Sequence, residues 1–180
     1  KVQTTSANSA PTLGTFTYAD TNSTTVNITG SNQYLVQGYS TLTVTPSSAT
    51  AKNGASISRY TAACNGVSVS NTNGAALTVG KVAVSGSVSV TLTVTDSRGY
   101  TASRSVTMTV IPYSKPRLSS ITLRRTNEIE AEMQLIFNGS ISAISVGGVQ
   151  KNSVQYVRYR YKKTSASSYG SYVSILGSTT

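Results

Sequence analysis

Histidine and tryptophan are absent from the sequence, and Cys64 is its one cysteine. A disulfide within this sequence and a cysteine–histidine nucleophile are therefore excluded, and a zinc site would lack its usual ligands. We interpret Cys64 as a small buried hydrophobic residue rather than a reactive thiol.

Carboxylates are scarce: there are five, namely Asp20, Asp96, Glu128, Glu130 and Glu132. The three glutamates occupy alternate positions of one expected strand, which points them all to a single solvated face. Too few carboxylates remain to form either a catalytic pair of acid and base or a calcium site, which needs several converging oxygen ligands. We therefore expect a protein that is not an enzyme and that uses no cofactor and no metal.

Long apolar runs and helical apolar stripes are missing as well. No stretch approaches the roughly 20 apolar residues of a membrane span, and no signal peptide is visible at Lys1. We expect no membrane partner, and we expect the chain to be a segment of a longer protein. Gly, Ser, Thr, Val and Tyr dominate instead, which is the composition of strands and turns. The sequence predicts an all-β fold.

The clearest pattern lies in residues 88–110, where apolar residues alternate with Ser and Thr on both sides of a polar break. Paired residues of an antiparallel hairpin point to the same face, and the apolar positions are even-numbered on both strands. The loop must therefore hold an odd number of residues. The predicted register places Val94 beside Ala102, Val90 beside Val106, Val88 beside Met108 and Leu92 beside Arg104.

A three-residue loop, Ser97-Arg98-Gly99, satisfies this parity when Asp96 lies opposite Tyr100. It matches a type I turn that ends in the left-handed region. We predict that Asp96 begins this structural turn and that Gly99 has a positive φ. Arg104 would lay its stem over the sheet edge and hold its head in water.

Residues 1–10 have no pattern and are interpreted as a linker, and residues 11–112 as a first domain. Asn-Gly turn signals at 53–54, 65–66 and 73–74 separate short alternating runs, a spacing typical of a β-sandwich. The strands expected besides the hairpin are 12–18, 26–28, 34–36, 42–44, 57–63, 67–69 and 77–84.

Pro112 and Pro116 end this domain, because a proline cannot continue a strand ladder. Residues 113–180 form a second domain with about four strands, fewer than the seven of a full sandwich. We expect these at 118–123, 131–137, 154–161 and 169–176, with a turn at Asn138-Gly139. Either this domain is cut short, or its partner strands come from elsewhere.

An incomplete second domain has a consequence for association. It would leave one apolar face uncovered and favour a homo-oligomer. The residues of that face are Met133, Leu135, Phe137, Val157 and Tyr159.

Positive charge is in excess: the net charge is +10, and residues 113–180 carry nine basic and three acidic side chains. This favours an anionic partner such as teichoic acid, phosphorylated polysaccharide or nucleic acid, or it serves solubility and protects sheet edges. Of these partners we expect host cell-wall polysaccharide or teichoic acid, and no nucleic acid.

A candidate binding stripe lies in residues 154–161. Tyr156, Arg158 and Arg160 share one side of the expected strand, and Val157, Tyr159 and Tyr161 share the other. If the second set packs inward, the first set forms an exposed aromatic and cationic stripe suited to a sugar or a phosphate. The alternative is an ordinary solvated sheet face.

Two resemblances follow from these residues. Val88 to Val110 resembles the last hairpin of bacterial immunoglobulin-like and polycystic-kidney-disease-like domains. The order 33–44, 53–60, this hairpin and 111–116 resembles repeated modules in minor structural and tail-tip proteins of siphophages infecting Gram-positive bacteria. Residues 154–161 followed by 169–173 are similar to the middle strands of a fibronectin type III module in the same proteins.

The resemblance covers about two thirds of the chain and carries no catalytic motif. It implies tandem immunoglobulin-like β-sandwiches, the second fibronectin type III-like, in an extracellular phage tail with other tail proteins as partners. The expected role is a spacer or adhesion module of a tail tip or fibre. The alternatives are a lectin-like module that binds a host receptor and the stalk domain of a bacterial adhesin.

Overall fold

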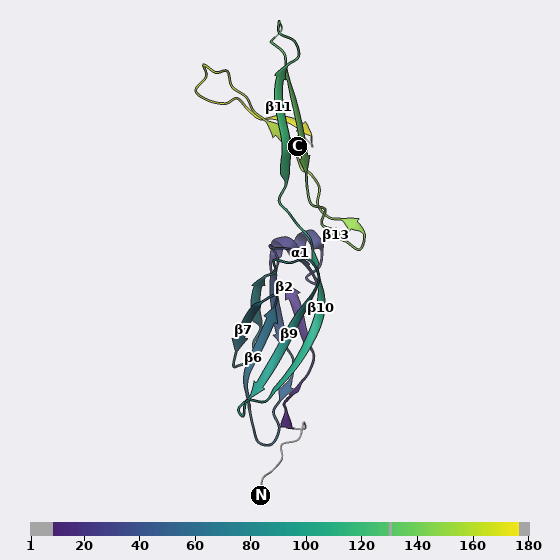
Figure 1. The fold of residues 1–180 in the computed structure, drawn as a ribbon, viewed down its shortest axis with the longest axis vertical. Helices are drawn as coiled ribbons and strands as arrows, with labels where there is room; N and C mark the ends of the chain where they lie inside the picture. The colour runs from purple at the N-terminus through teal and green to yellow at the C-terminus, as the bar shows by residue number, and fades with distance from the viewer. Residues whose placement is uncertain (1–8, 130, 177–180) are drawn as a thin grey trace. The chain divides into compact units, whose positions relative to one another are not determined.

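A computed structural model describes residues 9–129 and 131–176, and it divides the chain into two units (Figure 1). Unit 1 spans Lys1–Tyr113 and Ile144–Val149, and unit 2 spans Ser114–Ala143 and Gln150–Thr180. Strands dominate the described residues, beside one short helix. The predicted all-β fold is confirmed, whereas the immunoglobulin-like and fibronectin-like assignments stay predictions.

Unit 1 contains two main sheets. The larger has the order β3-β10-β9-β6-β7, and only β3 runs parallel to its neighbour. Its strands are β3 (Tyr34–Val36), β6 (Ile57–Cys64), β7 (Val67–Asn71), β9 (Gly86–Asp96) and β10 (Thr101–Ile111). The smaller sheet has the order β2-β4-β8, with β2 (Phe16–Asp20), β4 (Thr41–Pro46) and β8 (Leu77–Lys81). A short pair joins β1 (Thr12–Leu13) to β5 (Ala49–Thr50).

The two sheets of unit 1 enclose one hydrophobic core. Leu42 and Val44 of β4 are fully buried in the same cluster as Val90, Leu92 and Val94 of β9. Their even spacing is the period of two that a strand requires to present one face inward. Burying each such side chain stabilises the fold by about 1.5–3 kcal/mol. Unit 1 is thus a sandwich with a core of its own.

The β9–β10 hairpin has the predicted register: Val94 pairs with Ala102, Val90 with Val106 and Leu92 with Arg104. Gly99 has φ of 90°, and its N–H donates to the Asp96 carbonyl at 2.9 Å. The Asp96 N–H donates to the Tyr100 carbonyl at 2.9 Å, which closes the three-residue loop. The parity argument therefore recovers both the pairing and the loop.

The strand predicted at 26–28 is wrong, because Ser23–Thr29 forms the helix α1. The Asn22 side chain accepts from the Thr24 N–H at 3.0 Å, and Gly30, at φ 72°, closes the other end. Five of the seven residues are β-branched threonine, valine or isoleucine, which favour strands by propensity. The end caps and the burial of Thr25 and Thr29 override that preference.

Asp20, at the end of β2, connects α1 to the sheets through a carboxylate that is 3% exposed. One carboxylate oxygen accepts from the backbone N–H groups of Asn22 and Thr41, each at 2.9 Å. The other accepts from the hydroxyls of Ser40, at 2.5 Å, and Thr25. Four donors therefore compensate the burial of this charge.

The strand expected over 12–18 is split into β1 and β2. The Gly14 N–H donates to the Ser48 carbonyl at 2.8 Å between them, so the chain passes from the short β1–β5 pair into the smaller sheet. Of the predicted linker, residues 1–8 lie outside the described residues. Ser9, however, is buried within unit 1.

Unit 2 contains two separate strand pairs: β11 (Arg117–Arg125) with β12 (Met133–Ser140), and β15 (Val157–Tyr159) with β16 (Val173–Leu176). The predicted turn at Asn138-Gly139 is wrong, because both residues lie in β12 and pair with Ser120 and Leu118. The Asn138 amide donates to the Ser120 hydroxyl at 2.8 Å, so pairing with β11 decides the local structure.

The chain turns instead between Arg125 and Met133, which pair with each other at the end of the β11–β12 ladder. Glu128 and Glu132 therefore lie in the connecting loop and not on a strand, contrary to expectation. Glu130, expected on the same strand, lies outside the described residues.

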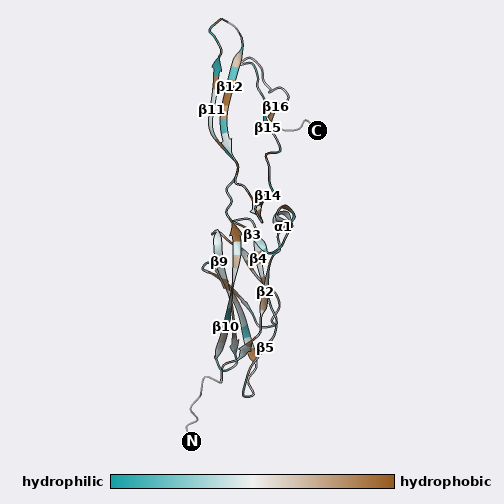
Figure 2. Ribbon diagram, turned by 90° about the vertical axis from the view of Figure 1, so that its right-hand side faces the viewer, coloured by the Kyte–Doolittle hydropathy of each residue, from teal (hydrophilic) through white to brown (hydrophobic). Residues whose placement is uncertain are grey.

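The β11–β12 pair exposes an apolar face. Ile121 pairs with Phe137 and Leu123 with Leu135, so these four side chains share that face. Ile121 is 61% exposed, Leu123 is 63% exposed, and Leu135 and Phe137 are half-buried. Figure 2 shows hydrophobic and hydrophilic segments alternating along β12. No side chain of unit 2 is buried within residues 114–129, 131–143 and 150–176.

The chain passes from unit 1 into the β11–β12 hairpin after Tyr113, and it re-enters unit 1 at Ile144. Ile144 is buried with Val36 and Ile111, and Tyr113 packs edge-to-face on Tyr39 with ring centres 5.0 Å apart. The exit lies within the predicted boundary at 112–116, but the return of 144–149 was not predicted. This segment contains β13 (Ser145–Val146), which pairs with β14 (Val149–Gln150) around Gly147 and Gly148.

Candidate functional site

Cations and tyrosine rings alternate in and beside the β15–β16 pair. The Arg158 guanidinium carbon lies 4.3 Å from the ring centre of Tyr156 and 4.5 Å from that of Tyr172. The Arg160 guanidinium carbon lies 5.1 Å from the Tyr172 ring centre and 4.9 Å from that of Tyr169. The Lys162 ammonium nitrogen lies 5.3 Å from the Tyr169 ring centre. We call these six side chains the cation–tyrosine ladder.

Alternate positions of the outgoing chain supply four members of the ladder, of which Arg158 lies in β15 and the others flank it. Residues 156, 158, 160 and 162 have the same parity, so an extended chain points them to one side. On the return strand, Arg158 pairs with Ser174 and Tyr159 with Val173. The Gly170 N–H donates to the Tyr161 carbonyl at 3.1 Å and holds the segment that carries Tyr169 against the outgoing chain.

The ladder is exposed and cationic. Tyr156 is 55% exposed, and Tyr169 and Tyr172 are each 53% exposed. Across residues 9–129 and 131–176, no carboxylate forms an ion pair with Arg158, Arg160 or Lys162. Each cation–π contact at an exposed position is worth about 0.5–1 kcal/mol. The contacts therefore order the side chains, while the positive charge has no carboxylate counter-ion among the described residues.

Sequence reasoning found half of the ladder. Tyr156, Arg158 and Arg160 lie together as the predicted stripe, and Val157 and Tyr159 on the other side are half-buried. Tyr161, expected to pack inward with them, is 65% exposed and stacks on Tyr159 with ring centres 6.4 Å apart.

Three members of the ladder were missed. Lys162 could have been found, because it continues the even-numbered set. Tyr169 and Tyr172 could not, because a loop separates them from β15 and the sequence does not show in which register the chain returns: Tyr159 pairs with Val173.

The second predicted site, the turn at Asp96, has a structural role in unit 1. The Asp96 carboxylate is 1% exposed and accepts from the backbone N–H groups of Arg98, at 2.9 Å, and Tyr100, at 3.1 Å. Arg98 also forms an ion pair with it at 2.6 Å. Burial alone raises the pKa of Asp96, but the hydrogen bonds from Arg98 and Tyr100 and the Arg98 charge together outweigh burial and lower it.

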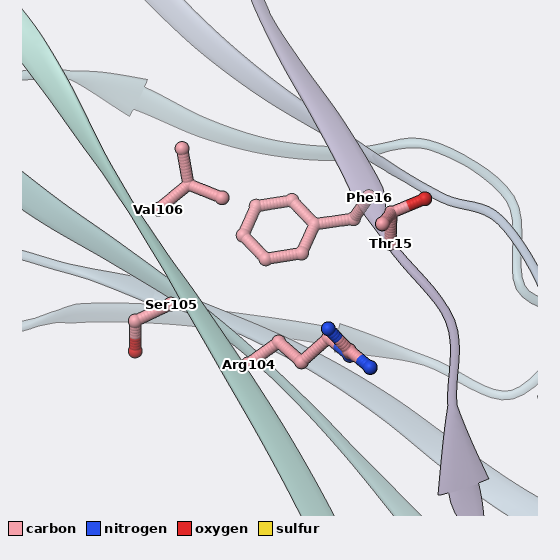
Figure 3. A pocket seen from close by; sticks show the side chains of 5 residues that line it. All are labelled: Thr15, Phe16, Arg104, Ser105 and Val106. Carbon is pink, nitrogen blue, oxygen red and sulfur yellow. The ribbon is translucent and has the colours of Figure 1, made fainter.

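Arg104 lines a pocket with Thr15, Phe16, Ser105 and Val106. Figure 3 shows the Phe16 ring pointing toward Val106 and the Arg104 side chain reaching toward Thr15. Arg104 is exposed, as predicted, but its Nε–H donates to the Leu13 carbonyl at 2.7 Å, a contact that was not predicted. This hydrogen bond links the Arg104 side chain of β10 to the Leu13 carbonyl of β1. We interpret this contact as protection of a sheet edge.

Cys64 is buried, and burial raises the pKa of its thiol. Within the described part of the chain, no group of His, Cys, Asp or Glu side chains could hold a metal ion. The one helix found in that part of the chain is too short to cross a membrane.

Residues 2–173 match the family described as "Siphovirus protein of unknown function (DUF859)". The chain belongs to this family. No curated protein and no solved structure matches the siphovirus protein. The resemblance to siphophage proteins is thereby supported at the level of the virus group, and the family suggests a structural role in association with the virion.

Proposed function

We propose that this siphovirus protein is a non-enzymatic, extracellular part of the phage tail, acting as a spacer or adhesion module of a tail tip or fibre on phages of Gram-positive bacteria. The observation that carries the proposal is the contrast between the two units. Unit 1 has a complete sandwich core, whereas the described residues of unit 2 bury no side chain and expose Ile121 and Leu123. Such a unit gains stability from neighbouring chains, as expected of a subunit in an assembly.

The inventory of reactive groups supports a role without catalysis. The carboxylates of Asp20 and Asp96 are buried and engaged by hydrogen-bond donors, so neither is available to a substrate. The thiol of Cys64 is buried and has a raised pKa. The sequence contains no histidine.

The tail location is tested by labelling purified virions with antibodies raised against this chain and imaging them by electron microscopy. We expect label at the distal end of the tail. Label on the capsid, or its absence from virions that contain all their other proteins, would overturn the proposal.

The spacer and adhesion roles are separated by binding of the purified chain to whole host cells. Binding supports adhesion through the exposed ladder. No binding by the chain, while intact virions adsorb normally, supports the spacer. A lectin-like module is the second candidate, favoured by the exposed rings of Tyr156, Tyr169 and Tyr172, and it predicts binding that neutral host polysaccharide competes away.

A further inference from the structure

We propose that the cation–tyrosine ladder binds a linear polyol phosphate polymer, with successive phosphates on successive cations. This inference rests on the adhesion role proposed above and names its ligand. Arg158, Arg160 and Lys162 supply the positive charge, and none forms an ion pair with a carboxylate of the described residues. Guanidinium groups are suited to phosphate because their N–H groups pair with two oxygens at once.

The spacing of the cations selects the polymer repeat. Alternate residues of an extended chain are about 7 Å apart, and they are separated by six backbone bonds. A three-carbon polyol phosphate also has six backbone bonds per phosphate, counted through one phosphorus, two oxygen and three carbon atoms. Arg158 lies in β15, and Arg160 and Lys162 follow it at alternate positions. An extended polymer of this kind therefore matches the repeat of an extended chain, with one phosphate for each cation. A polysaccharide with one carboxylate per disaccharide has a longer repeat and does not match.

The tyrosines disfavour nucleic acid, whose sugar-phosphate backbone has the same number of bonds per phosphate. Single-stranded nucleic acid binds proteins through bases that stack on open aromatic faces. Here a guanidinium already lies over the ring of Tyr156, and two cations lie over each ring of Tyr172 and Tyr169. Guanidinium N–H groups therefore lie beside the exposed parts of these rings, and together with the phenol hydroxyls they suit phosphates and polyol hydroxyls.

The stacked arrangement also holds the cations in place. A long side chain loses rotamer freedom when it binds, and contacts that order it beforehand lower this cost. Arg158 and Arg160 each contact two rings. Tyr172 contributes to both and is therefore the positioning residue of the ladder.

Binding is tested with the full chain and four immobilised probes: poly(glycerol phosphate), hyaluronan, oligo(dT) and dextran. We expect binding to poly(glycerol phosphate) that weakens about 20-fold between 50 and 200 mM salt, as release of counter-ions at three phosphates requires. Hyaluronan and oligo(dT) should bind more weakly, and dextran should not bind. Equal or tighter binding to oligo(dT) would overturn the proposal in favour of nucleic acid, and equal binding to hyaluronan would overturn the spacing argument.

Variants separate the ladder from general positive charge. The double variant Arg158→Gln/Arg160→Gln should lose at least tenfold in affinity for poly(glycerol phosphate). Lys115→Gln/Lys151→Gln removes the same charge from exposed positions outside the ladder and should retain it. Tyr172→Leu keeps every cation and should weaken binding severalfold.

Equal losses in the two double variants, or no binding by the unaltered chain, would overturn the ladder proposal. Neither result would change the labelling of virions by antibody. The experiments therefore distinguish an error in the proposed ligand from an error in the proposed location in the tail. Circular dichroism of each variant shows whether its fold is retained.

Discussion

Arg98 donates from one nitrogen, Nη2, to the Asp96 carboxylate at 2.6 Å and to the Ser9 carbonyl at 2.8 Å. Its guanidinium carbon also lies 5.1 Å from the ring centre of Tyr100. One side chain therefore joins the β9–β10 loop to the first described residue of the chain. The β9–β10 loop is therefore bound to the segment that precedes β1.

Gly99→Val should destabilise unit 1 by about 1–3 kcal/mol, because valine is strained at a φ of 90°. A Cβ at this position would meet no atom within 4 Å, so the cost is one of backbone conformation and not of a clash. Thermal unfolding measures it. Gly99→Asn is the matched control and should cost less, since asparagine tolerates left-handed conformations. An unchanged melting temperature for the valine variant would show that the loop assignment is wrong.

Acid should weaken unit 1 through Asp96. The folded pKa is lowered, so the contribution of Asp96 is complete above the ordinary carboxyl value of about 4 and is lost as the pH falls from there through the folded pKa. We expect the melting temperature to fall more steeply in this window for the unaltered chain than for Asp96→Asn. Parallel pH profiles for the two proteins would contradict this prediction.

Asp20→Ala should cost on the order of 3 kcal/mol, because it leaves buried donors of Thr25 and Ser40 without their acceptor. Denaturation in urea gives the value. Thr21→Ala, at the position next to Asp20, serves as the control. It removes only exposed hydrogen bonds, to the Thr41 carbonyl and the Thr43 hydroxyl, and should cost less than about 1 kcal/mol. If the two variants were equally stable, Asp20 would not be the connection between α1 and the sheets that its contacts indicate.

Residues 113–180 expressed alone should associate or fail to unfold cooperatively, because the β11–β12 face has no cover among the described residues. Analytical ultracentrifugation and thermal unfolding provide the measurement. Leu123→Ser in the full chain should reduce any self-association, while Thr122→Ser, on the opposite face of the same strand, should not. A monomeric fragment with a sharp unfolding transition would require a complete small domain instead.

Local pairing explains which elements could be predicted. The register of Val90 with Val106 follows from parity within one hairpin, and no distant contact is needed to derive it. The helix at Ser23–Thr29 could not be derived in this way, because the burial of Thr25 depends on Asp20 and on the fold around it. The Asn138-Gly139 signal failed for the same reason, since the partner strand β11 determines its conformation.

The candidate site shows the same division. Tyr156, Arg158 and Arg160 follow from alternation along one strand, which sequence displays directly. Tyr172 lies just before β16, after a loop whose length does not reveal the register of the return: Tyr159 pairs with Val173. Alternation along one strand predicts which residues share a face, but it does not predict which residues the next strand adds to that face when an irregular loop joins the two strands.

Because Ile144 is buried beside Ile111 in unit 1, residues 114–143 form an insertion between two segments of that unit. The chain leaves unit 1 after Tyr113, and the hydroxyls of Ser114 and Ser142 lie 2.7 Å apart at the base of the hairpin. Entry and exit are thus adjacent, which is the condition under which an insertion can be lengthened, shortened or replaced without disturbing its host. The hairpin is therefore a part that can change in length while the sandwich stays the same. A short glycine and serine turn that joins Ser114 to Ser142 should leave unit 1 folded.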